Sequence, residues 1–186
     1  MTSNEHISRQ FDAELEAIRA NVLQMGGLVE SQVKSAIESL VGGDVALMNR
    51  VIEDDHRVNG MEVKIDEACS QVIARRQPTA SDLRLVMTVV KTITDLERIG
   101  DEAEKIARMA KLLSQKNVPN LPRHHEIRHA AEIALDMLRK SLDAFARLDV
   151  VMAAQVVRQD DQVDEEFRAI MRYLITFMME DPRTIS

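Results

Sequence analysis

Apolar residues recur every three or four positions along almost the whole chain, which is the spacing that places them on one face of an α-helix. The first such stripe consists of Phe11, Leu15, Ile18, Val22, Met25, Val29, Val33, Ala36 and Leu40. Six glycines and four prolines are few for 186 residues, and aromatic residues make up only 3%, a composition that favours helices over strands. The pattern therefore predicts an all-α fold with five helices, at about residues 8–41, 45–76, 82–115, 124–148 and 149–180.

The two halves of the chain are related by an offset of 105 residues. Identical residues recur at this offset in pairs such as Asp44 and Asp149, Val51 and Val156, Val58 and Val163, Thr79 and Thr184, and Ser81 and Ser186. Two prolines within residues 117–122 break the helical pattern between the halves. We therefore expect two tandem three-helix bundles, the first over residues 1–116 and the second over 123–186, joined by a linker at 117–122.

The second bundle contains only two predicted helices. After Ser81 the first half continues into a third helix, whereas the sequence ends at Ser186. We therefore expect the chain to lack the final helix of a complete pair of repeats. An apolar face would then be uncovered, and uncovered apolar patches usually mark interaction sites. For this reason we also expect the protein to associate as a homodimer.

Two carboxylates, those of Glu97 and Asp101, lie four residues apart within the third predicted helix. At about 100° per residue they share a face with apolar or small residues, namely Val86, Val90, Ile93, Gly100 and Ala107. An unpaired carboxylate is very costly to bury. A pair directed at a helix seam therefore requires a compensating partner, either a basic side chain or a metal ion.

The same four-residue spacing occurs at Asp55 and Asn59 and, at the 105-residue offset, at Asp160 and Asp164. Two packed helices that carry such pairs surround one point with oxygen donors, which suits a divalent or trivalent metal ion. The residues predicted to hold a metal ion in the first bundle are Asp55, Asn59, Glu97 and Asp101, with Glu62, Asp66 and Glu104 as further candidates on the same seams. Asp160 and Asp164 would form part of a corresponding second site.

A helical scaffold with solvated acids is the competing interpretation, in which Arg57 or Arg98 neutralises the carboxylates.

A ferritin-like di-iron oxidase needs two Glu-x-x-His motifs in a bundle core, whereas this sequence has one, at 53–56, which lies away from the apolar stripe. The sequence contains no glycine-rich phosphate loop, cysteine pair or Ser/His/Asp arrangement. We therefore do not expect an enzyme.

Charge and hydropathy argue against two further classes of protein. A net charge of −7 disfavours nucleic-acid binding, and no basic run is long enough to anchor the chain to a membrane surface. No apolar stretch approaches the roughly 20 residues of a transmembrane helix.

The single cysteine, Cys69, shares a helical face with Val58, Ile65 and Val72. We expect it to be a buried thiol without an internal disulfide, which fits a reducing compartment.

Several stretches of the chain resemble the PhoU family, the phosphate-responsive regulators associated with bacterial phosphate transporters. These stretches are VIEDDHRVN at 51–59, EVKIDEAC at 62–69, RQPTASDLR at 76–84, LERIGD at 96–101, DAFARLD at 143–149 and MMEDPRT at 178–184. Together they span most of the chain, and the stretches at 76–84 and 96–101 are the most specific.

The resemblance implies a cytoplasmic protein, often dimeric, built of two tandem three-helix bundles. It also implies a negative regulator of the phosphate-starvation response, which connects the ATPase of a phosphate ABC transporter to a membrane sensor histidine kinase and limits phosphate uptake. Some members of the family bind iron or zinc clusters through acidic pairs, which correspond here to Asp55/Asn59, Glu97/Asp101 and Asp160/Asp164. Asn59 departs from the acid that this motif prefers.

The leading hypothesis is a non-enzymatic signalling adaptor between the transporter ATPase and the kinase. The alternative is a metal-binding helical bundle for metal storage or sensing. No cluster of basic residues in the sequence indicates a phosphate pocket. We therefore expect the adaptor to read phosphate status from its transporter partner rather than by binding the anion.

Overall fold

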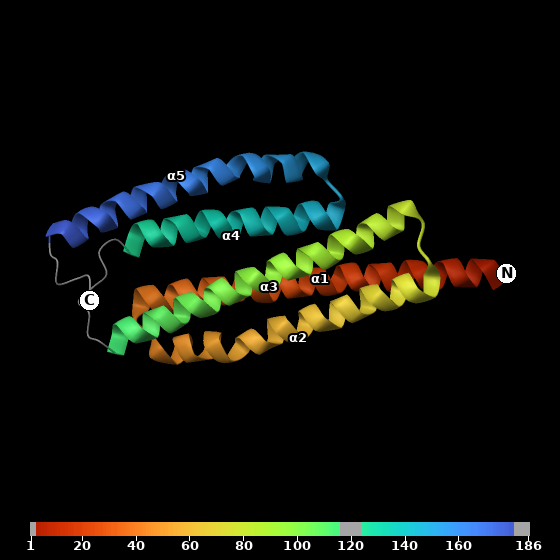
Figure 1. Ribbon diagram of the computed structural model, residues 1–186, viewed down its shortest axis with the longest axis horizontal. Coiled ribbons are helices and arrows are strands. Elements are labelled where there is room, and N and C mark those ends of the chain that lie inside the picture. The colour runs from red at the N-terminus through yellow and green to blue at the C-terminus, as the bar shows by residue number, and fades with distance from the viewer. Residues whose placement is uncertain (1–2, 116–123, 181–186) are drawn as a thin grey trace. The chain divides into compact units, whose positions relative to one another are not determined.

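The computed structural model describes residues 3–115 and 124–180, and within these ranges every regular element is an α-helix (Figure 1). The helices are α1 (Ser3–Gly42), α2 (Val45–Arg76), α3 (Ala80–Gln115), α4 (His124–Arg147) and α5 (Val150–Glu180). The predicted all-α fold is confirmed. The largest difference from the predicted bounds is at the first helix, which begins at Ser3 rather than near residue 8.

The chain forms two compact units, Met1–Lys116 and Asn117–Ser186. In the first unit, each of α1, α2 and α3 packs against the other two, which makes a three-helix bundle (Figure 1). In the second unit, α4 packs against α5 as a helical hairpin. The predicted linker at 117–122 lies outside the described residues. None of the described helices combines the length and hydropathy that a membrane-spanning segment requires.

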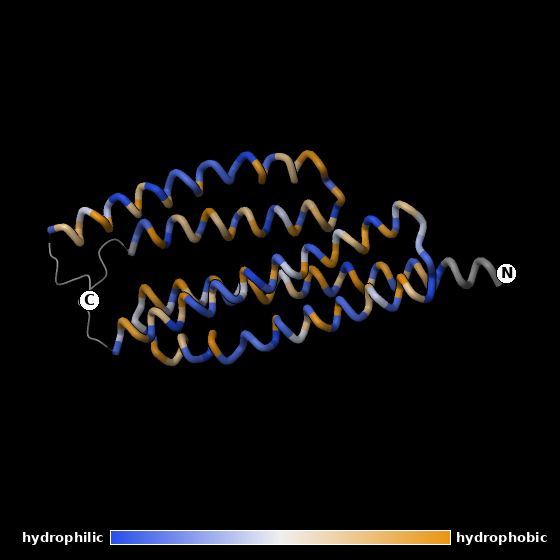
Figure 2. The backbone as a smooth tube through the Cα atoms, viewed as in Figure 1, coloured by the Kyte–Doolittle hydropathy of each residue, from blue (hydrophilic) through white to orange (hydrophobic). Residues whose placement is uncertain are grey.

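The core of the first unit is aliphatic and includes several alanines. Met25 of α1, Ile65 of α2 and Ile93 of α3 are fully buried, and burial of such a side chain contributes about 1.5–3 kcal/mol. Cys69 is buried as well, as expected. Figure 2 shows hydrophobic positions returning at helical intervals along all three helices. One cluster of the core is formed by Ala36, Met48, Val51, Ala103, Ala107 and Ala110.

The same turn joins α1 to α2 and α4 to α5. Gly43 and Leu148 are related by the 105-residue offset, and both have a positive φ, 67° and 55° respectively. Each is followed by an aspartate, Asp44 or Asp149, whose carboxylate accepts a backbone N–H from the first turn of the next helix at 3.0 Å. The duplication predicted from the sequence therefore extends to the backbone of this turn.

The second unit buries far less of its apolar surface than the first. Its buried apolar side chains, Ile133, Leu135 and Ala144, all belong to α4, and no described residue of α5 is buried. Four large apolar residues at four-residue spacing form an exposed row along α5, which we call the α5 row: Phe167, Met171, Ile175 and Met179. The described part of the second unit thus has the uncovered apolar face that the sequence predicted.

Candidate functional site

Asp55 lies in the seam where the three helices of the first unit meet. Its side chain belongs to α2, and the residue is only 8% exposed. One carboxylate oxygen accepts a hydrogen bond from Gln32 Nε2 of α1 at 2.8 Å, and the other accepts one from Asn59 Nδ2 at 3.3 Å. Both oxygens of this buried carboxylate therefore have amide partners, which offset part of the cost of its desolvation.

Gly100 brings α3 close to this buried carboxylate. A Cβ atom at residue 100 would lie 3.1 Å from Gln32 Oε1 and 3.7 Å from Asp55 Oδ1. The distances are this short because no side chain separates α3 from the other two helices here. Gly100 of the Glu97-Arg-Ile-Gly-Asp101 stretch is thus a packing residue, and the acids on either side of it are held close to Asp55.

The basic side chains named as neutralising partners pair with other acids. Arg57 forms an ion pair with Asp54 at 3.5 Å, and Arg98 forms one with Asp95 at 3.6 Å. Neither arginine has an ion pair with the Asp55 carboxylate among the described residues. The partner of Asp55 on α1 is instead the Gln32 amide. The sequence did carry a signal for Gln32, since it lies at core spacing between Val29 and Ala36.

Glu97 and Asp101 are half-buried on the flank of α3 that faces α2. Burial raises the pKa of Glu97 above its usual value, and the negative charges of Asp101, Glu62 and Asp55 raise it further. The Glu62 carboxylate also accepts a hydrogen bond at 3.5 Å from the hydroxyl of Thr94 on α3. The structure therefore brings these four carboxylates from two helices near enough to repel one another.

Four other predicted site residues lie elsewhere or have other partners. Asp66 is exposed, contrary to its predicted place on a seam. Glu104 is half-buried but forms an ion pair with Arg108 at 2.5 Å. In the second unit, Asp160 and Asp164 are both exposed on α5, and Asp164 pairs with Arg168 at 2.8 Å. The helical repeat places these aspartates at equivalent positions, but burial distinguishes Asp55 from Asp160.

The first-unit seam fits a metal ion in the chemistry of its donors but not in their arrangement. Two buried amide oxygens, Gln32 Oε1 and Asn59 Oδ1, have no hydrogen-bond partner among the residues that the structure describes. With the nearby carboxylates they make an oxygen-only donor set, which hard cations prefer. However, no three His, Cys, Asp or Glu side chains within residues 3–115 and 124–180 are grouped closely enough to hold a metal ion. The described arrangement thus lacks a complete ligand shell.

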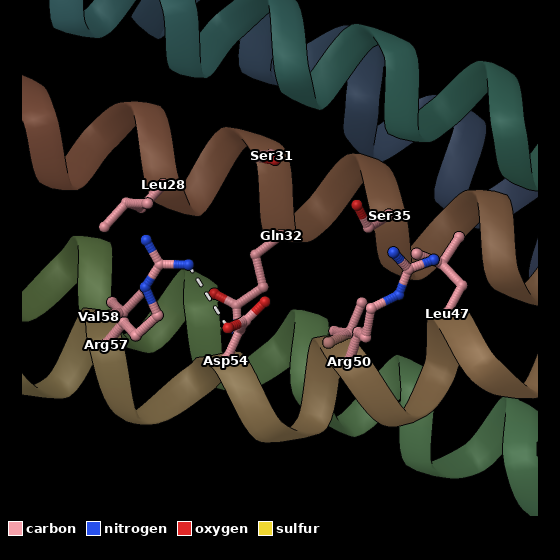
Figure 3. Close-up of a pocket in the computed structure, with 10 residues that line it drawn as sticks. Leu28, Ser31, Gln32, Ser35, Leu47, Arg50, Asp54, Arg57 and Val58 are labelled. Atoms are coloured by element: carbon pink, nitrogen blue, oxygen red, sulfur yellow. Dashed lines mark hydrogen bonds and ion pairs between the residues drawn. The ribbon is translucent and has the colours of Figure 1, made fainter.

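A second polar feature, a cleft between α1 and α2, was not anticipated from the sequence. It has a volume of about 160 Å³ and is lined by Arg50, Asp54 and Arg57 of α2 and by Ser31 and Ser35 of α1 (Figure 3). The sequence carried a partial signal, since Arg50 and Arg57 are seven residues apart and share a helical face. The sequence alone did not single out this cleft, in which two arginines and one aspartate come together.

Comparison with known proteins identifies relatives along almost the whole chain. A family model described as "PhoU domain" matches residues 22–110 and 127–186. The phosphate-specific transport system accessory protein PhoU of Escherichia coli (strain K12) is 53% identical over 184 residues, which cover 98% of this chain and 75% of that protein. The PhoU homolog of Pseudomonas aeruginosa is 49% identical over 182 residues, which cover 97% and 74% of the two chains.

Solved structures give the same answer for the fold. The crystal structure of PhoU from Pseudomonas aeruginosa superposes with a TM-score of 0.90 at 47% identity, covering 94% of this chain and 83% of that one. The phosphate transport system regulatory protein PhoU from Streptococcus pneumoniae superposes with a TM-score of 0.84 at 27% identity, covering 92% and 80%. The match extends over both units in sequence and in structure, and the chain therefore belongs to the PhoU family.

Proposed function

We propose that the protein is a non-enzymatic accessory regulator of a phosphate transport system. The observation that carries this proposal is the match, along almost the whole chain, to proteins named as phosphate-specific transport accessory proteins. The described residues add long helical surfaces suited to protein contacts, among them the exposed α5 row. These features favour a protein that acts by binding partners rather than by catalysis.

In this proposal the protein acts in the cytoplasm as an adaptor. It contacts the ATPase of a phosphate ABC transporter and a sensor histidine kinase, and it represses the phosphate-starvation response while limiting phosphate uptake. Its effect on the kinase requires only a different affinity for the kinase's two states, since a binding partner shifts a conformational equilibrium by that difference.

Deletion and complementation test the regulatory role. We expect a deletion strain to express phosphate-starvation genes in phosphate-rich medium, and we expect the intact chain to restore repression. Normal phosphate-regulated expression in the deletion strain would contradict the role.

A pull-down with the transporter ATPase and the kinase, with and without added metal, tests the adaptor mechanism separately. Repression without capture of either protein would exclude direct contact.

A metal-binding bundle for storage or sensing is the second candidate. The two unpartnered amide oxygens of Gln32 and Asn59, beside mutually repelling carboxylates, favour a cation at the first-unit seam. A bound iron or zinc ion would add positive charge beside these carboxylates. We expect the double variant Glu97→Ala, Asp101→Ala to hold less metal than the wild type after purification without chelator. Equal metal content in the two proteins would show that these acids are not ligands.

The matched control for this measurement is Glu102→Ala. Glu102 belongs to the same helix, but its carboxylate is exposed and forms an ion pair with Lys105 at 2.8 Å. A loss of metal in the Glu102 variant equal to that in the double variant would indicate non-specific attraction by an acidic surface. Retention of metal in the control, together with loss in the double variant, would assign the ligands to the seam.

A further inference from the structure

The α1/α2 cleft presents hydrogen-bond donors from both of its walls. Arg50 and Arg57 extend from α2 on either side of Asp54, and Ser31 and Ser35 lie one helical turn apart on α1 (Figure 3). Gln32, whose amide N–H donates to Asp55 at 2.8 Å, and valine and leucine side chains complete the lining. Two guanidinium groups and two hydroxyls therefore surround a volume of about 160 Å³ in which Asp54 is the only acidic residue.

Most of these donors have no partner within the described part of the protein. Arg50, Ser31 and Ser35 make no hydrogen bond or ion pair there. By contrast, the hydroxyl of Ser39, one turn further along α1, donates to its own helix at the carbonyl of Ala36. Arg57 has only its exposed ion pair with Asp54, and exposed pairs at 3.5 Å contribute little. The cleft therefore has donor capacity that its own residues do not use.

The second unit shows how the same positions look when their side chains satisfy one another. At the 105-residue offset, the positions of Ser31, Ser35 and Asp54 are occupied by Asp136, Lys140 and Gln159. These three side chains form a closed network. Lys140 contacts Asp136 at 2.5 Å, and Gln159 donates to Asp136 and accepts from Lys140, both at 3.1 Å.

The arginines of the cleft are likewise particular to the first unit. The positions of Arg50 and Arg57 are occupied in the second unit by Gln155 and Gln162, which carry no charge. The repeat therefore provides an internal comparison, in which the same helical framework either closes on itself or leaves two cations and two hydroxyls facing a cleft. The open arrangement of the first unit is the one that suits an anion.

We propose that the α1/α2 cleft binds a phosphate group. The guanidinium fork matches the spacing of phosphate oxygens, and hydrogen bonds between charged groups are stronger than neutral ones. The volume is well below the roughly 300 Å³ at which pockets for drug-sized ligands begin, so a small ion suits it. Asp54 adds selectivity, because inorganic phosphate at neutral pH retains a proton that a carboxylate can accept, whereas sulfate has none to donate.

This phosphate site extends the proposed function. The biological meaning of the site rests on that function. A regulator with such a cleft would read phosphate directly instead of relying only on its transporter partner. The phosphate group could belong to free inorganic phosphate or to a phosphorylated side chain of a partner. Both share the oxyanion chemistry that the arginines recognise, and the two sources are separated by using different probes.

The test is a calorimetric titration of the full chain at low ionic strength, since salt screens exposed charges. Three probes are used: inorganic phosphate, sulfate and O-phosphoserine. We expect saturable binding of inorganic phosphate, with sulfate at least about tenfold weaker because its contact with Asp54 is repulsive. Arg50→Ala combined with Arg57→Ala should lower phosphate affinity by about tenfold or more. Stronger arginine-dependent binding of O-phosphoserine would support the site and identify a phosphate ester as the ligand.

Arg98→Ala is the matched control. Arg98 forms an exposed pair with Asp95 three residues earlier at 3.6 Å, as Arg57 does with Asp54, but it lies outside the cleft. This variant should bind phosphate as the wild type does.

Asp54→Asn should still bind oxyanions but lose the preference for phosphate over sulfate. Ser31→Asp with Ser35→Lys introduces the closed pair of the second unit and should abolish binding while retaining helical circular dichroism.

The site is overturned if neither inorganic phosphate nor O-phosphoserine binds saturably to the wild type. It is also overturned if the double arginine variant, with wild-type circular dichroism, binds phosphate as tightly as Arg98→Ala does. The titration uses neither transporter nor kinase, so a negative result removes the site and leaves the regulatory role standing. Conversely, normal phosphate-regulated expression in the deletion strain would contradict the regulatory role and leave the binding measurement unchanged.

Discussion

At residue 100 the absence of a side chain lets three helices meet around a buried carboxylate. A Cβ atom there would approach Gln32 Oε1 to 3.1 Å and Val58 Cγ1 to 3.4 Å, and both of these neighbours are buried. At Gly60, within α2, a Cβ atom would meet nothing within 4 Å. Both glycines lie inside helices, but only Gly100 is closely packed. Comparing alanine at the two positions therefore distinguishes the effect of helix propensity from the effect of steric crowding.

We predict opposite effects for alanine at these two positions. Gly60→Ala should stabilise the first unit by up to about 1 kcal/mol, because alanine is the better helix former. Gly100→Ala gains the same propensity but overpacks the seam, which costs about 1–3 kcal/mol, so its net effect should be destabilising by about 1 kcal/mol. Urea unfolding followed by circular dichroism measures both. Equal stabilisation by the two substitutions would show that the seam relaxes freely.

Cys69 should be almost unreactive in the folded protein. Burial raises the pKa of its thiol to about 11, and the charge of Asp66 adds to the rise. Only the thiolate reacts, so at pH 8 about one molecule in a thousand carries the reactive form even before access is considered. Reaction with a disulfide reagent should therefore be slow at pH 8 and accelerate as the pH rises toward 11. The same reagent added in denaturant supplies the control, and equal rates in both states would contradict the prediction.

The individual contacts of the site were harder to predict from the sequence than its acidic residues. The four-residue spacing identified Asp55, Glu97 and Asp101, because residues at that spacing share a helical face. It could not identify Gln32 as the partner of Asp55, since that contact depends on how α1 and α2 are aligned lengthwise. Spacing within one helix does not specify the lengthwise alignment of two helices. The α1/α2 cleft was missed for the same reason.

At the scale of single elements, the helices and their ends follow closely from the sequence. The apolar stripe located all five, and Asp44 marked the start of α2 as a capping residue. The left-handed conformation of Leu148 was not predictable from its residue type, because leucine disfavours a positive φ. It becomes intelligible through the repeat, in which Gly43 occupies the corresponding position with nearly the same φ.

This comparison predicts that Leu148→Gly stabilises the turn between α4 and α5. Leu148 has a φ of 55° and is 61% exposed, so the substitution relieves backbone strain while losing little buried surface. The expected gain is about 0.5–1 kcal/mol after the entropy cost of glycine is subtracted. Hydrogen–deuterium exchange at the start of α5 measures it. The reciprocal change, Gly43→Leu, should weaken the first turn by a similar amount, and a neutral result in both would exclude strain.

At the scale of the whole molecule, the two units use one helical framework in different ways. In the first unit, α1, α2 and α3 bury their apolar faces against one another. Some polar groups at the Asp55 seam and in the α1/α2 cleft have no partner among the described residues. In the second unit the polar side chains at the positions equivalent to the cleft pair with one another, and the α5 row is exposed. Ligand binding is therefore expected of the first unit and protein contacts of the second.

Self-association is the prediction that belongs to this scale. The α5 row runs along one face of the helix at four-residue spacing, and burial of apolar surface is worth about 25 cal/mol per Å². A second copy that presents the same row can cover it by a two-fold contact in which each α5 lies against the other. Light scattering at micromolar concentration should therefore show a species heavier than the monomer.

The variant that tests this contact is Phe167→Glu combined with Ile175→Glu, which places two charges in the α5 row. Both side chains are exposed, so the fold should tolerate the change, and the protein should become monomeric because an unpaired carboxylate is costly to bury. Val63→Glu, at an exposed position of α2, is the control and should associate as the wild type does. A wild type that stays monomeric would exclude self-association. An equal mass for the associated wild type and the double variant would place the contact outside the α5 row.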